Sequence, residues 1–301
     1  MPPTTPSPTS DSDAPIGVFD SGVGGLTVLR ALRERLPDES LLYLGDTARL
    51  PYGTKSPETV VRYAEQAARV LVRRGVKLLV IACNTASAVA LEHLSKVFWP
   101  LPVIGVVEPG ADAACAASRS GEILVIATEG TVRGGAYERA IKARRADARV
   151  LQIACPLFVA LAEEGWVGGP IAGAIAHRYL DGVLREHAAA DCLVLGCTHF
   201  PVLRAAISEA VGPRFTLVDS AETTARVVAA QLAARGLLCS TAAGGLLRPK
   251  APEAASMLAR PGRCRFLATD APARFARVGA VFMGEALAPE LTVDAVELVD
   301  L

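Results

Sequence analysis

The chain has 301 residues, which is enough for two domains of ordinary size. Its composition, 51% hydrophobic and 21% charged, allows a sizeable core and excludes a chain that is disordered throughout. Basic and acidic residues balance at 31 each, so the charge does not indicate nucleic acid or an anionic membrane surface as a partner.

Cysteine usage and the N-terminal composition bear on the cellular compartment. The seven cysteines are odd in number and lack the spacing of a disulfide framework, so we expect a reduced, cytoplasmic protein. Residues 1–14 are rich in Pro, Ser, Thr and Asp and resemble no signal peptide, so we expect a disordered tail there. No uninterrupted apolar run reaches about 18 residues, and we expect no membrane span.

Short apolar runs alternate with helical patterns along the chain, which predicts a mainly parallel α/β sheet. Outside the repeated segments described next, we expect strands at 41–44, 103–107 and 266–269. We expect helices at 26–36, 57–74, 86–97, 170–188 and 272–282. The segment 240–264 is richer in Gly, Pro and Ala, which indicates a loop or an insertion.

Two pairs of segments resemble each other in the same order along the chain. The apolar runs 78–83 and 192–197 each end in a cysteine that is followed by polar residues. The runs 16–22 and 123–131 each end in hydroxyl and glycine residues. The repeats predict two halves of like topology, with chance as the alternative because short strands that end in glycine are common.

Cys83 and Cys197 are the first candidates for chemistry, because ligands of open α/β sheets bind at the carboxyl ends of strands. A thiol with an ordinary pKa of about 8.5 can serve as a base or as an acid. Two thiols on opposite sides of a site can remove a proton from one face of a carbon and return one to the other face. Isomerisation at a stereocentre requires such proton transfer on both faces of the carbon. The alternative is a pair of buried structural cysteines.

Reactivity should separate these two thiols from the remaining buried ones. We expect Cys83 and Cys197 to be alkylated faster than Cys155 or Cys192. A redox pair is not indicated, because no CxxC motif is present. A disulfide between Cys192 and Cys197 is excluded if one extended strand separates them.

Other polar residues follow the expected strands and turns. Asp20, in a glycine-rich loop, can bind an ammonium group or assist proton transfer, and the alternative is a helix cap. The turn with Tyr52 and Gly53 can offer N–H groups to a carboxylate, as can the loop from Thr128 to Thr131. Ordinary turns are the alternative for both segments.

His199 and Glu163 complete the set of candidates. His199 lies two residues after Cys197, where an imidazole can lower a thiol pKa or transfer a proton. A Cys-His zinc site is the alternative, but a matched second pair of ligands is lacking. Glu163 lies at the end of an apolar segment, and a solvated helix end is its alternative.

These residues together resemble glutamate racemase, of the aspartate/glutamate racemase superfamily. The matching segments are FDSGVGGLTV (19–28), GDTARLPYGTKS (45–56), ACNTAS (82–87), EPG (108–110), ATEGTVRGGAY (127–137), CPLFVALAEEG (155–165) and LGCTHFP (195–201). The C-terminal part, 265–301, is also similar to the last strand and helix of that family.

The resemblance implies two similar doubly wound α/β domains with mainly parallel sheets and the active site in the cleft between them. We expect residues 15–102 with 216–301 to form the first domain and 103–215 the second. The resemblance also implies direct deprotonation at Cα, without cofactor or metal, that converts L-glutamate to D-glutamate for peptidoglycan synthesis.

Residue roles follow from the same match. Cys83 matches the cysteine that acts on the D enantiomer and Cys197 the one that acts on the L enantiomer. Asp20, Glu163 and His199 match groups that assist these cysteines. The expected substrate-binding residues are Asp20, Ser21, Tyr52, Gly53, Asn84, Thr85, Thr128, Thr131, Thr198 and His199.

One departure and several alternatives accompany the match. Gly134 stands where the family often has a small hydroxyl residue, so we expect the helix start after Thr131 to be less well capped. The alternative functions are an aspartate or hydantoin racemase, or a DNA gyrase-binding inhibitor, for which no basic extension is present. We expect a homodimer, and neither nucleic acid nor a membrane as partner.

Overall fold

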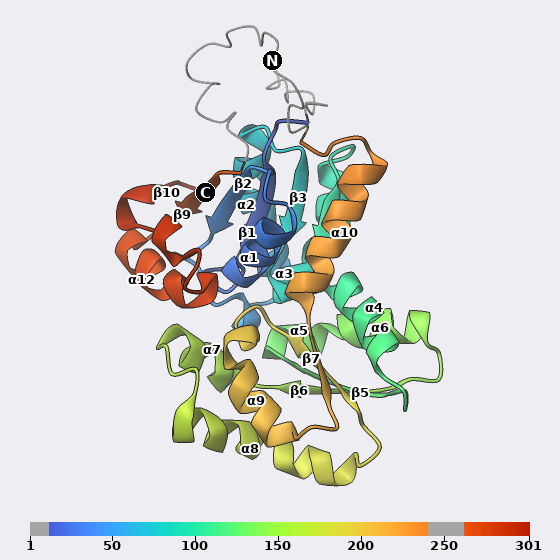
Figure 1. The fold of residues 1–301 in the computed structure, drawn as a ribbon. Helices are drawn as coiled ribbons and strands as arrows, with labels where there is room; N and C mark the ends of the chain where they lie inside the picture. The colour runs from blue at the N-terminus through green and yellow to red at the C-terminus, as the bar shows by residue number, and fades with distance from the viewer. Residues whose placement is uncertain (1–11, 240–261) are drawn as a thin grey trace, which may run out of the picture.

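The computed structural model describes residues 12–239 and 262–301. Within these ranges the strands form one six-stranded and one four-stranded sheet, with parallel pairing throughout (Figure 1). The predicted α/β class with mainly parallel sheets is therefore confirmed. The predictions for 1–14 and 240–264 fall for the most part outside the described residues.

The six-stranded sheet has the strand order β10-β9-β2-β1-β3-β4 and forms, with its helices, what we call the first half. Its strands are β1 (Ile16–Asp20), β2 (Leu41–Gly45), β3 (Leu78–Ile81), β4 (Val103–Gly105), β9 (Cys264–Ala268) and β10 (Val296–Leu298). Side chains alternate between two cores, so that Ile16 and Val18 face one and Phe19 faces the other.

Helices cover both faces of this sheet. On the face of Ile16 and Val18 lie α1 (Leu26–Arg35), α10 (Ser220–Ala234) and α12 (Pro272–Met283). On the opposite face lie α2 (Pro57–Arg73) and α3 (Asn84–Val97). Ser56 caps α2 by accepting a hydrogen bond from the Thr59 N–H, and Pro57 occupies the first turn. The short helix η1 (Tyr52–Thr54) precedes α2, and η3 (Ala288–Glu290) and η4 (Val293–Ala295) follow α12.

The four-stranded sheet has the order β6-β5-β7-β8 and forms, with its helices, the second half. Its strands are β5 (Glu122–Ala127), β6 (Arg149–Ala154), β7 (Cys192–Gly196) and β8 (Thr216–Asp219). One face packs against α4 (Val107–Ala117) and α6 (Ala136–Arg144), and the other against α7 (Pro156–Glu163), α8 (Gly169–Glu186) and α9 (Arg204–Val211). The short helices α5 (Glu129–Gly134) and η2 (Phe200–Leu203) follow β5 and β7.

The two sheets repeat one topology, as the sequence repeats predict. β1 lies between β2 and β3, with β4 outside β3; β5 lies in the same way between β6 and β7, with β8 outside β7. β3, which precedes Cys83, and β7, which precedes Cys197, therefore occupy equivalent places. The runs 16–22 and 123–131 likewise contain the equivalent strands β1 and β5.

Strand pairing moves both expected domain boundaries by one strand. β4 pairs with β3 in the six-stranded sheet, although the sequence boundary places 103–107 in the second domain. β8 pairs with β7 in the four-stranded sheet, although residues from 216 onward are expected in the first domain. The chain therefore leaves each half only after its fourth strand, which is the outermost strand beside β3 or β7.

The helices bear on one more expectation from the sequence. Within the two described ranges, none combines the length and the apolar character that a bilayer span requires.

Candidate active site

Cys83 lies between the carboxyl end of β3 and the first turn of α3. Its thiol donates to Ser21 Oγ at 3.5 Å, and its sulfur accepts from the Ala86 N–H at 3.5 Å. The sulfur thus serves as the N-cap of α3, which begins two residues earlier than the sequence predicts. Burial, together with the nearby Asp20 carboxylate, raises the pKa of Cys83 to about 12. At neutral pH this residue is a thiol and a proton donor.

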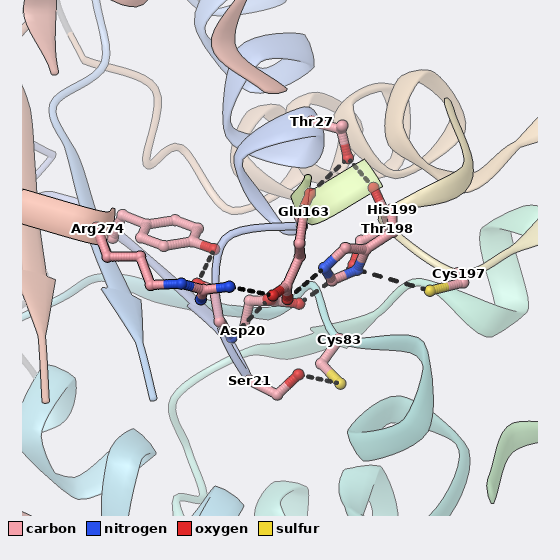
Figure 2. A network of polar contacts seen from close by, with 12 residues as sticks. Asp20, Ser21, Thr27, Cys83, Glu163, Cys197, Thr198, His199 and Arg274 are labelled. Atoms are coloured by element: carbon pink, nitrogen blue, oxygen red, sulfur yellow. Dashed lines mark hydrogen bonds and ion pairs between the residues drawn. The ribbon is translucent and has the colours of Figure 1, made fainter. Parts of the chain in front are cut away.

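Cys197 occupies the equivalent position after β7 and faces the same cavity. Its Sγ lies 3.8 Å from His199 Nδ1 (Figure 2). The cavity has a volume of about 30 Å³ and is lined by Ser21, Pro51, Tyr52, Gly53, Cys83, Asn84, Thr85, Thr128, Val159, Cys197, Thr198 and His199. The sequence prediction that both thiols meet at one site agrees with this lining. The volume has room for only about two water molecules, so an amino acid enters only if the site expands.

A chain of charged groups leads from Cys197 to the surface. His199 Nε2 lies 3.3 Å from Glu163 Oε1, and Glu163 Oε2 accepts from Arg274 at 2.9 Å (Figure 2). Burial opposes charge on the imidazole, but the hydrogen bonds to Cys197 and Glu163 outweigh it and raise the pKa of His199 to about 10. Burial also opposes charge on Glu163, yet His199 and Arg274 hold the pKa of this carboxyl below its usual value. His199 is therefore a cation beside Cys197 at neutral pH.

Asp20 is fully buried at the end of β1, between the two halves. Its carboxylate accepts from the Gly22 N–H at 2.9 Å and from Thr198 Oγ1 at 3.4 Å. Burial raises the pKa of Asp20, although the charge of His199 opposes the shift. Among the contacts of the described residues, no Lys or Arg pairs with this carboxylate. A buried carboxylate with so few partners is suited to accept the ammonium group of an amino acid.

The glycines of the loop after β1 leave room for these side chains. A Cβ at Gly25 would lie 2.5 Å from Asp20 Cβ, and one at Gly24 would lie 2.5 Å from His199 Nδ1 and from Thr198 Oγ1. The loop therefore brings the first half against the Thr198-His199 segment of the second. This close approach, rather than a nucleotide-binding turn, explains the glycine-rich sequence.

Hydroxyl and amide groups line the side of the cavity between α3 and α5. The Oγ1 atoms of Thr85, Thr128 and Thr131 lie 3.0 to 3.3 Å from one another and join the two halves. Asn84 Oδ1 accepts from the Tyr137 hydroxyl at 2.7 Å, whereas its buried Nδ2 has no hydrogen-bond partner within the described structure. An unpaired buried donor is costly, and a substrate carboxylate would satisfy it.

Tyr52 and Gly53 contribute backbone and shape rather than a hydroxyl group. The Tyr52 hydroxyl donates to Asp46, so it is already engaged beside the cavity. Gly53 lies so close to α5 that a Cβ there would be 2.7 Å from Thr128 Cβ. Both residues line the cavity, and their contact with substrate stays a prediction.

The helix that starts after Thr131 is α6, which has Gly135 as its N-cap and no side-chain cap, as the sequence predicts; Gly134 itself does not lie at that start. Thr128 caps α5 by accepting from the Thr131 N–H, so the start of this helix is capped without help from residue 134. Gly134 is instead the last residue of α5, and a Cβ there would meet only ordinary contacts with Val89 and Ala88.

Two residues of the site were not found by sequence reasoning. Tyr137, which orients Asn84, lies inside a segment that carries the resemblance, so the match itself was a usable signal. Arg274 lies on α12, in a pattern that predicts only a helix near the C-terminus. Nothing local distinguishes it from the nearby Arg277, because its partner Glu163 is 111 residues away.

Disulfide formation and zinc binding are two further roles open to cysteines. All seven cysteines are free thiols. Within residues 12–239 and 262–301, no group of three or more His, Cys, Asp and Glu side chains has the arrangement of a metal site.

The geometry changes the expected order of cysteine reactivity. Cys83 and Cys197 are equally exposed, at 5% each, but of these two only Cys197 faces a cation, the imidazolium of His199. The pKa of Cys83 is raised to about 12, mainly by burial, and the same holds for Cys155 and Cys192. We now expect iodoacetamide at neutral pH to label Cys197 first among these four buried cysteines, because the His199 imidazolium stabilises the negative charge of an attacking sulfur. Peptide mass spectrometry over time measures this, and equal labelling of Cys83 and Cys197 would contradict it.

Comparisons with known proteins agree with this geometry. The sequence model of the family described as Asp/Glu/Hydantoin racemase matches residues 24–228. A glutamate racemase of Geobacter metallireducens is 53% identical over 89% of this chain and 92% of its own length. One of Syntrophus aciditrophicus is 46% identical over 91% of this chain and 94% of its own.

Solved structures give the same result. A glutamate racemase from Thermus thermophilus, in complex with β-chloro-D-alanine, superposes with a TM-score of 0.79 at 43% identity and covers 97% of this chain and 98% of its own. One from Francisella tularensis, in complex with D-glutamate, gives a TM-score of 0.81 at 33% identity, covering 96% and 98%. The family match extends over more than half of the chain, and the relatives over most of it. The chain therefore belongs to the Asp/Glu/Hydantoin racemase family.

Proposed function

We propose that this protein is an isomerase that interconverts L- and D-glutamate with two cysteine bases and no cofactor, and that it supplies D-glutamate for peptidoglycan. The observation that carries the proposal is the placement of Cys83 and Cys197 at equivalent strand ends of the two halves, facing one cavity. The relatives that cover most of this chain at 40% identity or more are glutamate racemases, which supports the choice of reaction.

The two thiols have different surroundings, and this suits a proton transfer in two directions. With L-glutamate bound, the Cys197 thiolate removes the Cα proton, and its charge is stabilised by the imidazolium of His199. The Cys83 thiol then delivers its proton to the opposite face of Cα, leaving a thiolate on Cys83 and a thiol on Cys197. With D-glutamate the same steps run in reverse, so each turnover exchanges the roles of the two sulfurs.

Substrate binding is assigned to polar groups of the cavity wall and to Asp20, which is buried behind Thr198 of that wall. Asp20 receives the ammonium group, because it is a buried carboxylate that no Lys or Arg side chain pairs with in the described structure. The Asn84 amide receives a carboxylate, because its Nδ2 is unpaired. The hydroxyl groups of Ser21, Thr85, Thr128 and Thr198, and the backbone at Tyr52 and Gly53, complete the polar lining. Thr131 lies behind this lining, where its hydroxyl is within hydrogen-bond distance of those of Thr85 and Thr128. Together these groups match an amino acid with a second carboxylate.

Aspartate is the substrate to be distinguished from glutamate. An aspartate racemase from Picrophilus torridus shares the fold at a TM-score of 0.50 but only 17% of the sequence. The far closer glutamate racemases therefore favour glutamate. No feature of the described residues supports a gyrase-binding function.

The deciding experiment follows purified protein with D-glutamate in D₂O, after treatment with EDTA and hydroxylamine to remove metals and carbonyl cofactors. We expect full racemisation, with deuterium at Cα of the L product while the remaining D substrate stays protiated at early times. A two-base exchange gives this pattern, because the product receives its hydrogen from a different thiol. Faster turnover of aspartate, or a rate restored only by added pyridoxal phosphate or metal, would contradict the proposal.

Assembly and location remain predictions. The homodimer expected from the resemblance is tested by size-exclusion chromatography with light scattering on the full chain. The cytoplasmic location rests on the seven cysteines, all of which are free thiols in the structure. Fractionation of cells that express the protein at native level tests it.

A further inference from the structure

Arg274 reaches the catalytic groups of the second half from a helix of the first half. It lies in the first turn of α12, which packs on the six-stranded sheet, whereas its partner Glu163 is the last residue of α7 (Figure 1). The two side chains form an ion pair with Nη2 and Oε2 2.9 Å apart. Figure 2 shows the row that results, with Arg274, Glu163, His199 and Cys197 in order.

The turn that presents Arg274 is held in place by hydrogen bonds to the loop after β2. Asp270 and Thr47 exchange two hydrogen bonds, of 2.6 and 2.8 Å. The Thr269 hydroxyl donates to Asp46 at 2.9 Å, and Asp46 is also the acceptor of Tyr52 in the cavity wall. Ala271, which follows, has a φ of 50°, a left-handed conformation that is costly for alanine. Such strain persists where surrounding contacts fix it, and it clusters at functional sites.

The position of Glu163 explains what the arginine does. Glu163 is largely buried, and the charged and titratable groups that face it are His199 and Arg274. His199 in turn faces Cys197, Glu163 and Asp20. Burial opposes the ionisation of Glu163, but a cation beside each carboxylate oxygen keeps this side chain ionised and fixes its orientation. With Oε2 held by Arg274, Oε1 is directed at His199 Nε2, and the other ring nitrogen is directed at the Cys197 sulfur.

We propose that Arg274 is a positioning residue for the thiolate of Cys197, acting through Glu163 and His199, and that it supports proton removal from the L enantiomer but not from the D enantiomer. The inference rests on the proposed function for the identity of the substrate. It goes beyond that function because it gives Arg274, a residue of the last long helix, a role in supporting one of the two bases and not the other. Cys83 has no corresponding chain, because its thiol contacts only Ser21 and the Ala86 N–H in the described structure.

Racemisation itself cannot show the asymmetry, because the two enantiomers are equal in free energy and kcat/KM must change equally in both directions. Elimination from a glutamate analogue with a leaving group at Cβ needs only one base and can show it. We expect Arg274→Gln to lower the rate of elimination from the L analogue about tenfold, as if the pKa of one group in the row had changed by about one unit. Elimination from the D analogue should stay within about twofold of the parent.

The pH profile gives a second readout that a loss of packing would not produce. Arg274 lowers the pKa of Glu163, so without it Glu163 takes up a proton at a higher pH and the imidazolium loses its anionic partner. The acid limb of L elimination should therefore move to higher pH in Arg274→Gln. Arg274→Lys keeps the charge and should recover most of the rate and the parental acid limb.

Arg277→Gln is the matched control, because it removes the same charge from an exposed position of the same helix. It should leave both eliminations and the pH profile unchanged. Equal losses with the L and D analogues, no loss in Arg274→Gln, or an Arg274→Lys protein no better than Arg274→Gln would each overturn the inference. Thermal melts of all three variants show whether any of them is unfolded.

Alkylation of Cys197 separates this inference from the proposed function, because it needs no substrate. In Arg274→Gln we expect iodoacetamide to label Cys197 more slowly than in the parent while labelling of Cys83 stays the same. If the parent protein fails to racemise glutamate, the proposed function is wrong but this labelling still decides the role of Arg274. If the parent is active and labelling of Cys197 is unchanged, only the assignment of Arg274 is wrong.

Discussion

Cys83→Ser and Cys197→Ser should each lower racemisation of glutamate by at least about a thousandfold. A serine hydroxyl is a far weaker base than a thiolate, and each sulfur serves one face of Cα. The cavity walls hold the two thiols on different halves of the molecule, so neither can replace the other without rotation of the substrate. The measurement is the rate of change in optical rotation with either enantiomer.

Each variant should retain half of the chemistry. Cys83→Ser keeps the base on the L side and should still eliminate from the L analogue with a leaving group at Cβ, and Cys197→Ser should still eliminate from the D analogue. Cys192→Ser is the control, since Cys192 is buried within β7 and does not line the cavity. A variant that eliminates equally from both enantiomers, or that racemises near the parental rate, would show that the two-base assignment is wrong.

The second large effect is expected for Asp20→Asn, which removes the carboxylate assigned to the substrate ammonium. Loss of a buried charge-assisted contact costs about 3 kcal/mol, so we expect kcat/KM to fall about a hundredfold, with a rise in KM. The amide fits the same place, because its oxygen accepts from the Gly22 N–H as the carboxylate does and the Thr198 hydroxyl can accept from its nitrogen. A lower kcat with unchanged KM would instead assign Asp20 to proton transfer.

The same substitution should stabilise the free protein at neutral pH. Burial raises the pKa of Asp20 above its unfolded value, so the folded state holds the proton more tightly than the unfolded state. The free energy of unfolding therefore falls as pH rises from about 3.9 through the raised folded pKa. Asparagine carries no charge to bury, so Asp20→Asn should have a higher Tm than the parent at pH 7 and no advantage at a pH below both pKa values.

Asp191→Asn is the control with the opposite sign. Burial opposes the Asp191 charge, but hydrogen bonds from Ser118 and Ser120 lower its pKa on balance, so its carboxylate stabilises the folded state above the unfolded pKa. Asp191→Asn should lower Tm at neutral pH and leave kcat/KM unchanged, because Asp191 lies outside the cavity. An Asp20→Asn protein that loses both activity and Tm would contradict the view that this buried charge is kept for the substrate.

The sequence alone determined the features that depend on local pattern. Apolar runs of strand length, alternating with helical periods, predicted the parallel α/β class, and the repeated runs before Cys83 and Cys197 predicted the equivalent positions of β3 and β7. The segments of the resemblance named the family and most of the cavity lining. These inferences succeeded because the spacing of apolar residues and the residue types that follow a strand can both be read from a few adjacent residues.

The tertiary structure alone decided what depends on distant neighbours. The fourth strand of each half was assigned to its sheet by edge pairing, which no local pattern reveals. Only the folded structure shows that the Tyr52 hydroxyl donates a hydrogen bond to Asp46 and that Asn84 Nδ2 lacks a partner within the described structure. The charge on His199 is supported by the Glu163 carboxylate, and the ionisation of that carboxylate is supported by Arg274, which lies in the other half of the molecule. Protonation states and ion pairs are set by distance, burial and dielectric surroundings, and these exist only once the chain has folded.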